Sequence, residues 1–97
     1  MKSQTSTSDP QALPARVRAL VEDFASELNR GRRVRVHAHS HLERDLGLDS
    51  LARVELIARL ERSLGVRLRD RVALEAEQVQ DLIEAVRAGA RVSRAAP

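Results

Sequence analysis

A serine at the start of a predicted helix is the residue best placed to do chemistry. Ser50 follows a glycine-containing loop, and residues 45–51 read DLGLDSL. Its simplest role is that of a helix cap, because serine and aspartate oxygens accept hydrogen bonds from the free N–H groups of a first helical turn. The position also suits covalent attachment, since a phosphodiester on an exposed hydroxyl there would lie beside those N–H groups and the positive end of the helix dipole. The pattern alone leaves both roles open.

Three imidazoles at a spacing of two residues form a second candidate site. In an extended segment, His37, His39 and His41 would share one side, an arrangement that could bind a metal ion. No carboxylate or fourth ligand is evidently placed to complete it, and the alternative is a solvated loop. We therefore predict no metal site. No glycine-rich phosphate loop and no paired-carboxylate site is evident either, so the sequence offers no convincing catalytic constellation.

The composition limits the class of protein. Ninety-seven residues suffice for one small domain, and the absence of cysteine excludes a disulfide framework, a cysteine-zinc site and a cysteine nucleophile. No stretch of 18 apolar residues is present to span a membrane. Residues 1–9 lack the apolar core of a secretory signal, so we expect a cytoplasmic protein.

The charge raises the possibility of nucleic-acid binding. There are 17 basic and 14 acidic residues, which gives a net charge of +3. The basic residues are interleaved with acidic ones instead of gathering on one face, and the chain has a single aromatic residue, Phe24, on which a base could stack. We therefore predict no nucleic-acid partner.

The hydrophobic pattern predicts a first helix over residues 14–30. Its apolar residues recur at helical spacing, and Gly31 follows as a stop; they are Val17, Leu20, Val21, Phe24 and Leu28. Pro14 suits the first turn of a helix. Residues 1–12 are predicted to be a disordered tail.

Residues 32–48 are predicted to form a long first loop. Val34, Val36 and Ala38 alternate with polar residues, which is typical of a short strand. A lone strand has no partner in this chain, so we expect an extended loop, with Leu42 and Leu46 turned inward.

A second helix is predicted over residues 50–64, ended by Gly65. Its wide apolar face comprises Leu51, Val54, Leu56, Ile57, Ala58, Leu60 and Leu64. Glu55, Arg59 and Arg62 fall on the opposite, solvent side. Glu55 precedes Arg59 by four residues, the favourable order for an ion pair.

The remainder is predicted to hold a short helical segment and a last helix. Asp70 would cap the short segment over residues 70–77, and the last helix would begin near Val79 and end at Gly89. We therefore predict an all-α fold, a small four-helix bundle of three longer helices and one short one. The domain would span residues 13–89, with a frayed tail over 90–97. The first helix would pack against the second and the last, burying Phe24 and Leu56.

The run around Ser50 closely resembles the phosphopantetheine attachment motif of acyl carrier proteins. The resemblance continues without gaps through the next helix and covers about residues 14–86. It is strongest over residues 45–61 and weak in the first helix. Beyond the motif it rests on Val54, Glu55, Leu56, Leu60, Glu61, Leu68, Asp70, Ala73, Val79 and Asp81.

This resemblance implies a carrier that catalyses nothing itself. Ser50 would receive 4′-phosphopantetheine from coenzyme A through a separate phosphopantetheinyl transferase that uses magnesium. Asp49 would help to position the serine, and Leu51 would lie at the interface with the transferase and other partners. The thiol of the arm would carry acyl groups as thioesters. The partners that load and process them would be a ligase, an acyltransferase or a ketosynthase, and we expect a monomer.

Departures from the family pattern narrow the class. Peptidyl carriers usually have Gly-Gly-His/Asp-Ser, whereas residues 47–50 read GLDS, which favours an acyl carrier. Fatty-acid carriers that stand alone are typically acidic, whereas this chain is basic, with Arg53, Arg59 and Arg62 on the helix that partners usually contact. A role in polyketide, specialised lipid or other secondary metabolism is therefore favoured, with Glu55, Arg59 and Arg62 in partner recognition.

Two other functions stay open on the sequence. The same helical fold could serve as an unmodified protein-interaction module. Less favoured is a small nucleic-acid binder that uses Arg30, Arg32, Arg33 and Arg35. Ala73, Ala76 and Ala85 leave a further choice, because small side chains either make room for an acyl chain or allow close helix packing.

Overall fold

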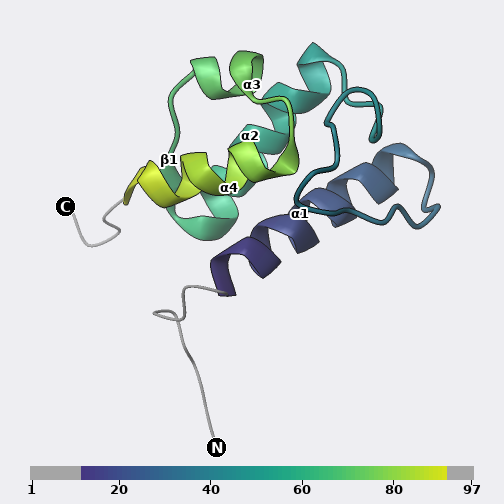
Figure 1. Cartoon of the computed structure of the whole chain (residues 1–97), viewed down its shortest axis with the longest axis horizontal. Helices are drawn as coiled ribbons and strands as arrows, with labels where there is room; N and C mark the ends of the chain where they lie inside the picture. Colours follow the sequence, from purple (N-terminus) through teal and green to yellow (C-terminus); the bar gives the residue numbers. More distant parts are fainter. Residues whose placement is uncertain (1–11, 92–97) are drawn as a thin grey trace, which may run out of the picture.

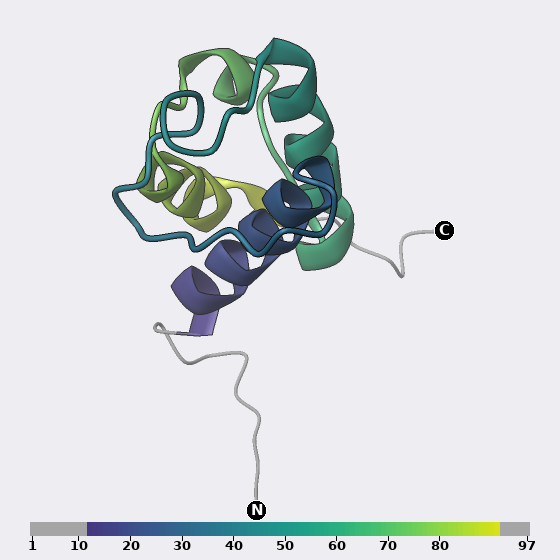
Figure 2. The same cartoon turned by 90° about the vertical axis from the view of Figure 1, so that its right-hand side faces the viewer.

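A computed structural model describes residues 12–91 of the chain (Figure 1). The elements in chain order are α1 (Ala12–Leu28), α2 (Ser50–Leu64), β1 (Val66–Arg67), α3 (Arg71–Glu75), α4 (Val79–Ala88) and β2 (Ala90–Arg91). The predicted all-α fold, with three longer helices, one short one and a long first loop, is confirmed. In Figure 2, α2 and α4 lie on opposite sides, with α1 below and α3 at the top.

Both predicted tails differ from the structure at their inner boundaries. Ala12 is helical, and residues 90–91 form a strand that pairs with β1. The rest of each predicted tail, residues 1–11 and 92–97, lies outside the described residues.

The first helix begins and ends two residues earlier than predicted. Pro14 is the third residue of α1, within the first turn, where a missing N–H costs no helical hydrogen bond. At the other end, Arg30 and Gly31 have φ values of 60° and 82°, which are not helical. The Gly31 N–H donates to the Ser26 carbonyl at 2.8 Å and closes the end of the helix.

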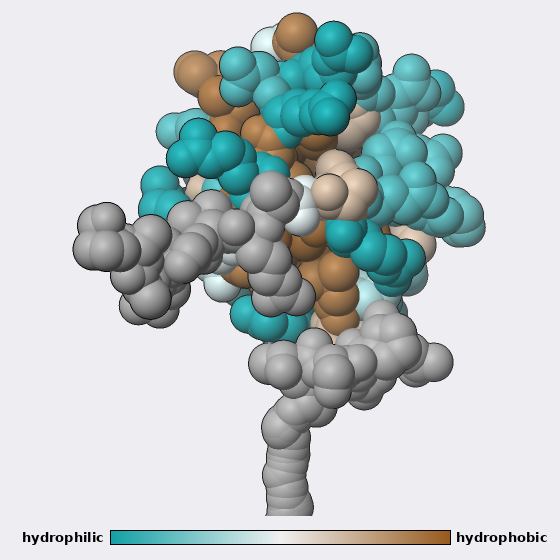
Figure 3. Space-filling model, turned by 90° about the vertical axis from the view of Figure 1, so that its left-hand side faces the viewer, coloured by the Kyte–Doolittle hydropathy of each residue, from teal (hydrophilic) through white to brown (hydrophobic). Residues whose placement is uncertain are grey.

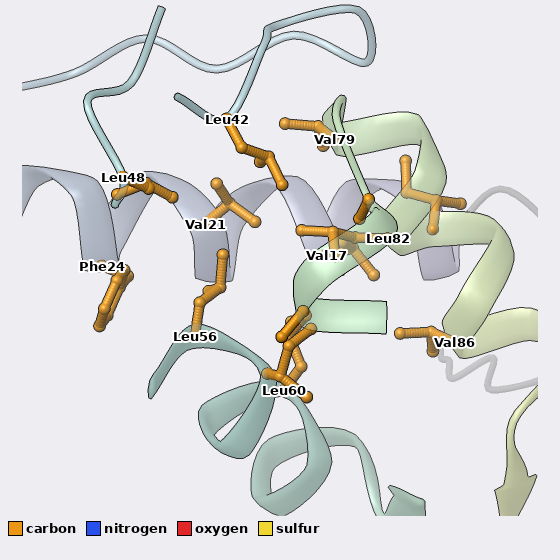
Figure 4. Packing of buried hydrophobic residues seen from close by; sticks show 14 of the residues in the cluster. Val17, Val21, Phe24, Leu42, Leu48, Leu56, Leu60, Val79, Leu82 and Val86 are labelled. Carbon is orange, nitrogen blue, oxygen red and sulfur yellow. The ribbon is translucent and has the colours of Figure 1, made fainter. Parts of the chain in front are cut away.

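The core lies where α1 meets α2 and α4, as predicted. Phe24 is 3% exposed and Leu56 is fully buried. Figure 4 shows the side chains of the three helices converging, and these are Val17, Val21 and Phe24 from α1, Leu56 and Leu60 from α2, and Val79, Leu82 and Val86 from α4. Ala73 and Ala76 are buried in the same cluster, which favours their role in close packing.

The predicted apolar face of α2 is wrong at two positions. Its boundaries match the prediction, but Leu51 is 72% exposed and Val54 is 51% exposed. The neighbouring elements cover a narrower stripe of the helix, which keeps Leu56, Ile57 and Leu60 from the prediction and adds Ala52. Apolar spacing shows which residues are hydrophobic, whereas the placement of α1 and α3 decides which of them are covered.

The long loop is tied to α1 along its first part. The Val34 N–H donates to Ser26 Oγ at 3.1 Å, and the Val36 N–H donates to Glu22 Oε2 at 3.0 Å. These two bonds turn Val36 into the core, where it is 3% exposed. The alternation that resembled a strand is therefore real, but side chains of a helix take the place of a neighbouring strand.

The second part of the loop pairs with the start of α4. Its backbone bonds are Leu42 N–H to Glu77 O at 2.8 Å, Val79 N–H to Ser40 O at 3.0 Å and Gln80 N–H to Ala38 O at 2.8 Å. Leu42 and Leu46 are buried as predicted, and Leu48 joins them.

Two features near the C-terminal end were not predicted. Val66 and Arg67 pair antiparallel with residues 90–91, a contact that the hydrophobic pattern did not indicate. The predicted cap at Asp70 is wrong, because its backbone is helical, with φ of −56° and ψ of −35°, and its side chain caps no N–H group.

Candidate functional site

The start of α2 separates the two roles proposed for its serine. Asp49 is the cap, with φ of −80° and ψ of −174°, and its Oδ1 accepts a hydrogen bond from the Ala52 N–H at 2.8 Å. Ser50 is the first helical residue and is exposed. Because Asp49 supplies the cap, the Ser50 hydroxyl is not needed for it.

The turn before Ser50 is held by its own hydrogen bonds and by burial. Gly47 has φ of 72°, a conformation that favours glycine, and its N–H donates to Glu43 O at 2.9 Å. The Leu48 N–H donates to Leu42 O at 2.9 Å, and the Leu48 side chain is fully buried. The serine is thus held in place by a turn that is packed against the core.

The first turn of α2 offers donors to an anion. Within residues 12–91, no acceptor is recorded for the N–H groups of Ser50 and Leu51. Free N–H groups at a helix start, together with the helix dipole, favour negative charge. A phosphodiester on Ser50 therefore fits the residues present, although the Asp49 carboxylate occupies part of the same end of the helix.

Exposed hydrophobic side chains lie beside the serine. Leu51 and Val54 follow Ser50 on α2, and Leu74 on α3 is 70% exposed. The sequence pattern placed Leu51 and Val54 in the core and gave no role to Leu74. In the face shown in Figure 3, hydrophobic side chains reach the surface among hydrophilic ones toward the top of the view.

The predicted recognition residues fall into two groups. Asp49, Leu51, Glu55 and Arg62 are exposed, like Ser50, and are open to a partner. Arg59 is different: its side chain is only 33% exposed.

Arg59 is held by α1 and not by Glu55 as predicted. Its Nη1 bonds Glu27 Oε2 at 2.9 Å, and its guanidinium lies 5.0 Å from the centroid of the Phe24 ring. Arg59 pairs with α1 in preference to Glu55 because α1 offers it both a carboxylate and an aromatic face. The expectation that Arg59 lies on the solvent side was wrong, because its side chain lies against α1.

The ion pair shifts the pKa values of both Glu27 and Arg59. The hydrogen bond from Arg59 holds the pKa of Glu27 below its usual value, and the hydrogen bond to Glu27 raises the pKa of Arg59. Because the Glu27 side chain is 61% exposed, solvent screens the pair and its contribution to stability is small.

The three histidines do not converge. His37 and His39 are exposed, whereas His41 is half-buried and its Nδ1 accepts a hydrogen bond from the Arg44 N–H at 3.1 Å. Among residues 12–91, no three His, Cys, Asp or Glu side chains are grouped to hold a metal ion. In the same part of the chain, no helix has the length and apolar character needed to cross a membrane.

Comparison with known proteins assigns the family. The family model described as "Phosphopantetheine attachment site" matches residues 18–86, well over half of the chain. Comparison with curated proteins found no match. The matched region contains α2, α3 and the turn before Ser50 whole. The chain therefore belongs to the phosphopantetheine attachment site family, whose carrier domains hold 4′-phosphopantetheine covalently and are generally not catalysts themselves.

Proposed function

We propose that this chain is an acyl carrier protein whose Ser50 bears the 4′-phosphopantetheine arm. The observation that carries the proposal is the division of roles at the start of α2, where Asp49 caps the helix and leaves the exposed Ser50 hydroxyl free. The bound arm supplies a thiol on which acyl groups are held as thioesters. Ser50 holds that arm at a fixed point on the surface of the fold.

A separate phosphopantetheinyl transferase, acting with magnesium in the cytoplasm, makes the attachment. Ser50 Oγ loses its proton and attacks the phosphorus that carries the pantetheine in coenzyme A. The Oγ–P bond forms, and the bond to the adjacent phosphate breaks, so adenosine 3′,5′-bisphosphate leaves. Asp49 contributes by holding the first turn of α2, and the free N–H groups there favour the negative charge of the new phosphodiester.

The surface beside Ser50 suits transient partners. Leu51 and Val54 expose apolar surface within one turn of the serine, and Leu74 adds more on α3, which packs against α2. Exposed hydrophobic groups rimmed by polar residues mark protein-interaction sites. The partners we propose are the transferase and the ligase, acyltransferase or ketosynthase that load and process the acyl group.

The charge of α2 favours a specialised pathway, in polyketide, lipid or other secondary metabolism. Arg62 is exposed and available to a partner, whereas Arg59 is already paired with Glu27. A cognate enzyme would therefore place acidic groups opposite Arg62 in the first instance. Enzymes that serve acidic carriers would meet reduced attraction here, which mainly slows association.

Counting thiols tests the proposal directly, because the chain has no cysteine. The protein is incubated with coenzyme A, magnesium and a broad-specificity transferase, freed of small molecules, and titrated for thiols. Wild type should gain one thiol per chain, and so should Ser63→Ala, which removes another exposed hydroxyl from α2. Ser50→Ala should gain none. A wild type without a thiol would favour an unmodified interaction module, and a thiol on Ser50→Ala would place the arm elsewhere.

A further inference from the structure

The first part of the long loop presents a row of basic side chains to solvent. Arg33, Arg35 and His37 are exposed, and they alternate with Val34 and Val36, which turn toward the core. In an extended segment, side chains two residues apart lie on one side at a spacing of roughly 6.6 Å. We call these three residues the basic row. In Figure 2 the segment crosses the near side of the molecule, below the turns that lead into α2.

One edge of this segment's backbone is hydrogen-bonded to α1, and the other edge has no hydrogen-bond partner among the described residues. The N–H groups of Val34 and Val36 bond side chains of α1. For the N–H groups of Arg33 and Arg35, no acceptor is recorded within residues 12–91. Successive N–H groups of an extended chain point in opposite directions, so these two point away from α1. They form a short strand edge that lacks a neighbour in the described part of the chain.

The charge of the row is not balanced nearby. Between residues 12 and 91, the one ion pair within 4.0 Å is that of Arg59 with Glu27. The Glu22 carboxylate, which does contact this segment, accepts the Val36 N–H and holds the segment from its other side. Within the described part of the chain, the guanidinium groups of Arg33 and Arg35 therefore have no carboxylate partner and keep their donors available.

We propose that this edge binds an extended acidic segment of a partner protein by strand addition. Main-chain hydrogen bonds to Arg33 and Arg35 would supply the pairing, and carboxylates at alternate positions of the added strand would lie opposite the two guanidinium groups. Arginine matches carboxylate geometry with two parallel hydrogen bonds. His37 extends the row with a side chain that also forms hydrogen bonds to carboxylates.

The same features argue against two other occupants. A second copy of this edge would place arginine opposite arginine, and like charges directly opposite disfavour pairing. A single-stranded nucleic acid would need exposed aromatic side chains on which to stack, whereas Phe24, the one aromatic residue, is 3% exposed. Strand addition by an acidic protein segment uses both the open backbone edge and the charge. The inference stands whether or not Ser50 is modified.

The test uses the full chain and a synthetic peptide of alternating glutamate and threonine, followed by NMR. A lysine–threonine peptide and a short oligothymidylate of similar length are the comparison ligands. At low salt, the glutamate peptide should bind and slow hydrogen exchange at the amides of Arg33 and Arg35, whereas Val34 and Val36 should change little. Protection of two alternate amides is specific to strand pairing, because diffuse charge attraction would not produce it.

Charge reversal on the row supplies the matched comparison. Arg33→Glu/Arg35→Glu should weaken binding of the glutamate peptide at least about tenfold at low salt, and the difference should shrink as salt rises. Arg69→Glu/Arg71→Glu, a pair of exposed arginines at the start of α3, should bind like wild type. Unchanged protection of Val36 would show that the row variant keeps its fold.

Three kinds of result would overturn the inference. The first is the absence of glutamate-peptide binding at low salt. The second is binding without protection of Arg33 and Arg35, or equal loss in both double variants, because either would mean general charge attraction. The third is tighter binding of oligothymidylate that is lost on changing the row, which would assign the surface to a nucleic acid.

Discussion

Truncation of Phe24 tests the packing that holds the site in place. The ring is 3% exposed and lies in the cluster with Leu48 and Leu56 (Figure 4). It also carries the Arg59 guanidinium on its face. Replacing a buried phenylalanine by alanine costs about 3–5 kcal/mol. Loss of the cation–π contact adds about 0.5–1 kcal/mol. The total stability of such a domain is about 5–15 kcal/mol, so Phe24→Ala should remove a large part of it.

The assay is thermal and urea unfolding followed by circular dichroism. Since 1 kcal/mol shifts the Tm of a small domain by about 4–8 °C, Phe24→Ala should lower Tm by more than about 10 °C. Leu28→Ala is the matched control on the same helix, because Leu28 is 48% exposed and should matter much less. A Phe24→Ala Tm within about 2 °C of wild type, or an equal loss in Leu28→Ala, would refute the packing described here.

Substitutions at three further positions test individual contacts. Asp49→Ala removes the cap of α2 and should cost about 1 kcal/mol in urea unfolding, whereas Asp49→Ser should keep most of it; equal losses would show that the cap bond is unimportant. Gly89→Ala should destabilise the fold by about 1–3 kcal/mol, because overpacking forces neighbouring atoms to move. The Cβ of the new alanine would lie 3.0 Å from Leu68 Cδ2 and 3.1 Å from a backbone oxygen. An unchanged Tm would contradict that contact. Glu27→Gln tests the pH dependence: the pKa of Glu27 is lowered in the folded state, so the ion pair stabilises above the ordinary value of 4.5 and that contribution is lost as pH falls through the lowered pKa. The small Tm difference between wild type and Glu27→Gln should therefore vanish in acid, and a difference that persists at low pH would show another cause.

The elements were predictable where local signals agree. The boundaries of α2 follow from Asp49 before it and Gly65 after it; Gly65 has φ of 66°, and its N–H bonds Glu61 O at 2.9 Å. The burial of Phe24, Leu42, Leu46 and Leu56 also followed from spacing. In each case the signal lies within a few residues of the feature that it predicts.

Several of the misses involve contacts between distant parts of the chain. Arg59 bonds Glu27, 32 residues away, so the local pair on α2 was the wrong choice. Leu51 is exposed because no described element covers its stripe of α2, which the spacing of apolar residues cannot reveal. The motif singled out Ser50, whose role as the attachment site stays a prediction, whereas the capping role of Asp49 required the backbone geometry.

Intact-mass measurement after transfer tests the central claim most directly. Wild type, Ser50→Ala and Ser63→Ala are treated with coenzyme A, magnesium and a broad-specificity phosphopantetheinyl transferase, and each is weighed whole. Wild type and Ser63→Ala should gain the mass of one phosphopantetheine group, and Ser50→Ala should gain nothing while keeping its helical circular dichroism. A gain of mass on folded Ser50→Ala, or none on wild type, would contradict the assignment of Ser50 as the attachment site.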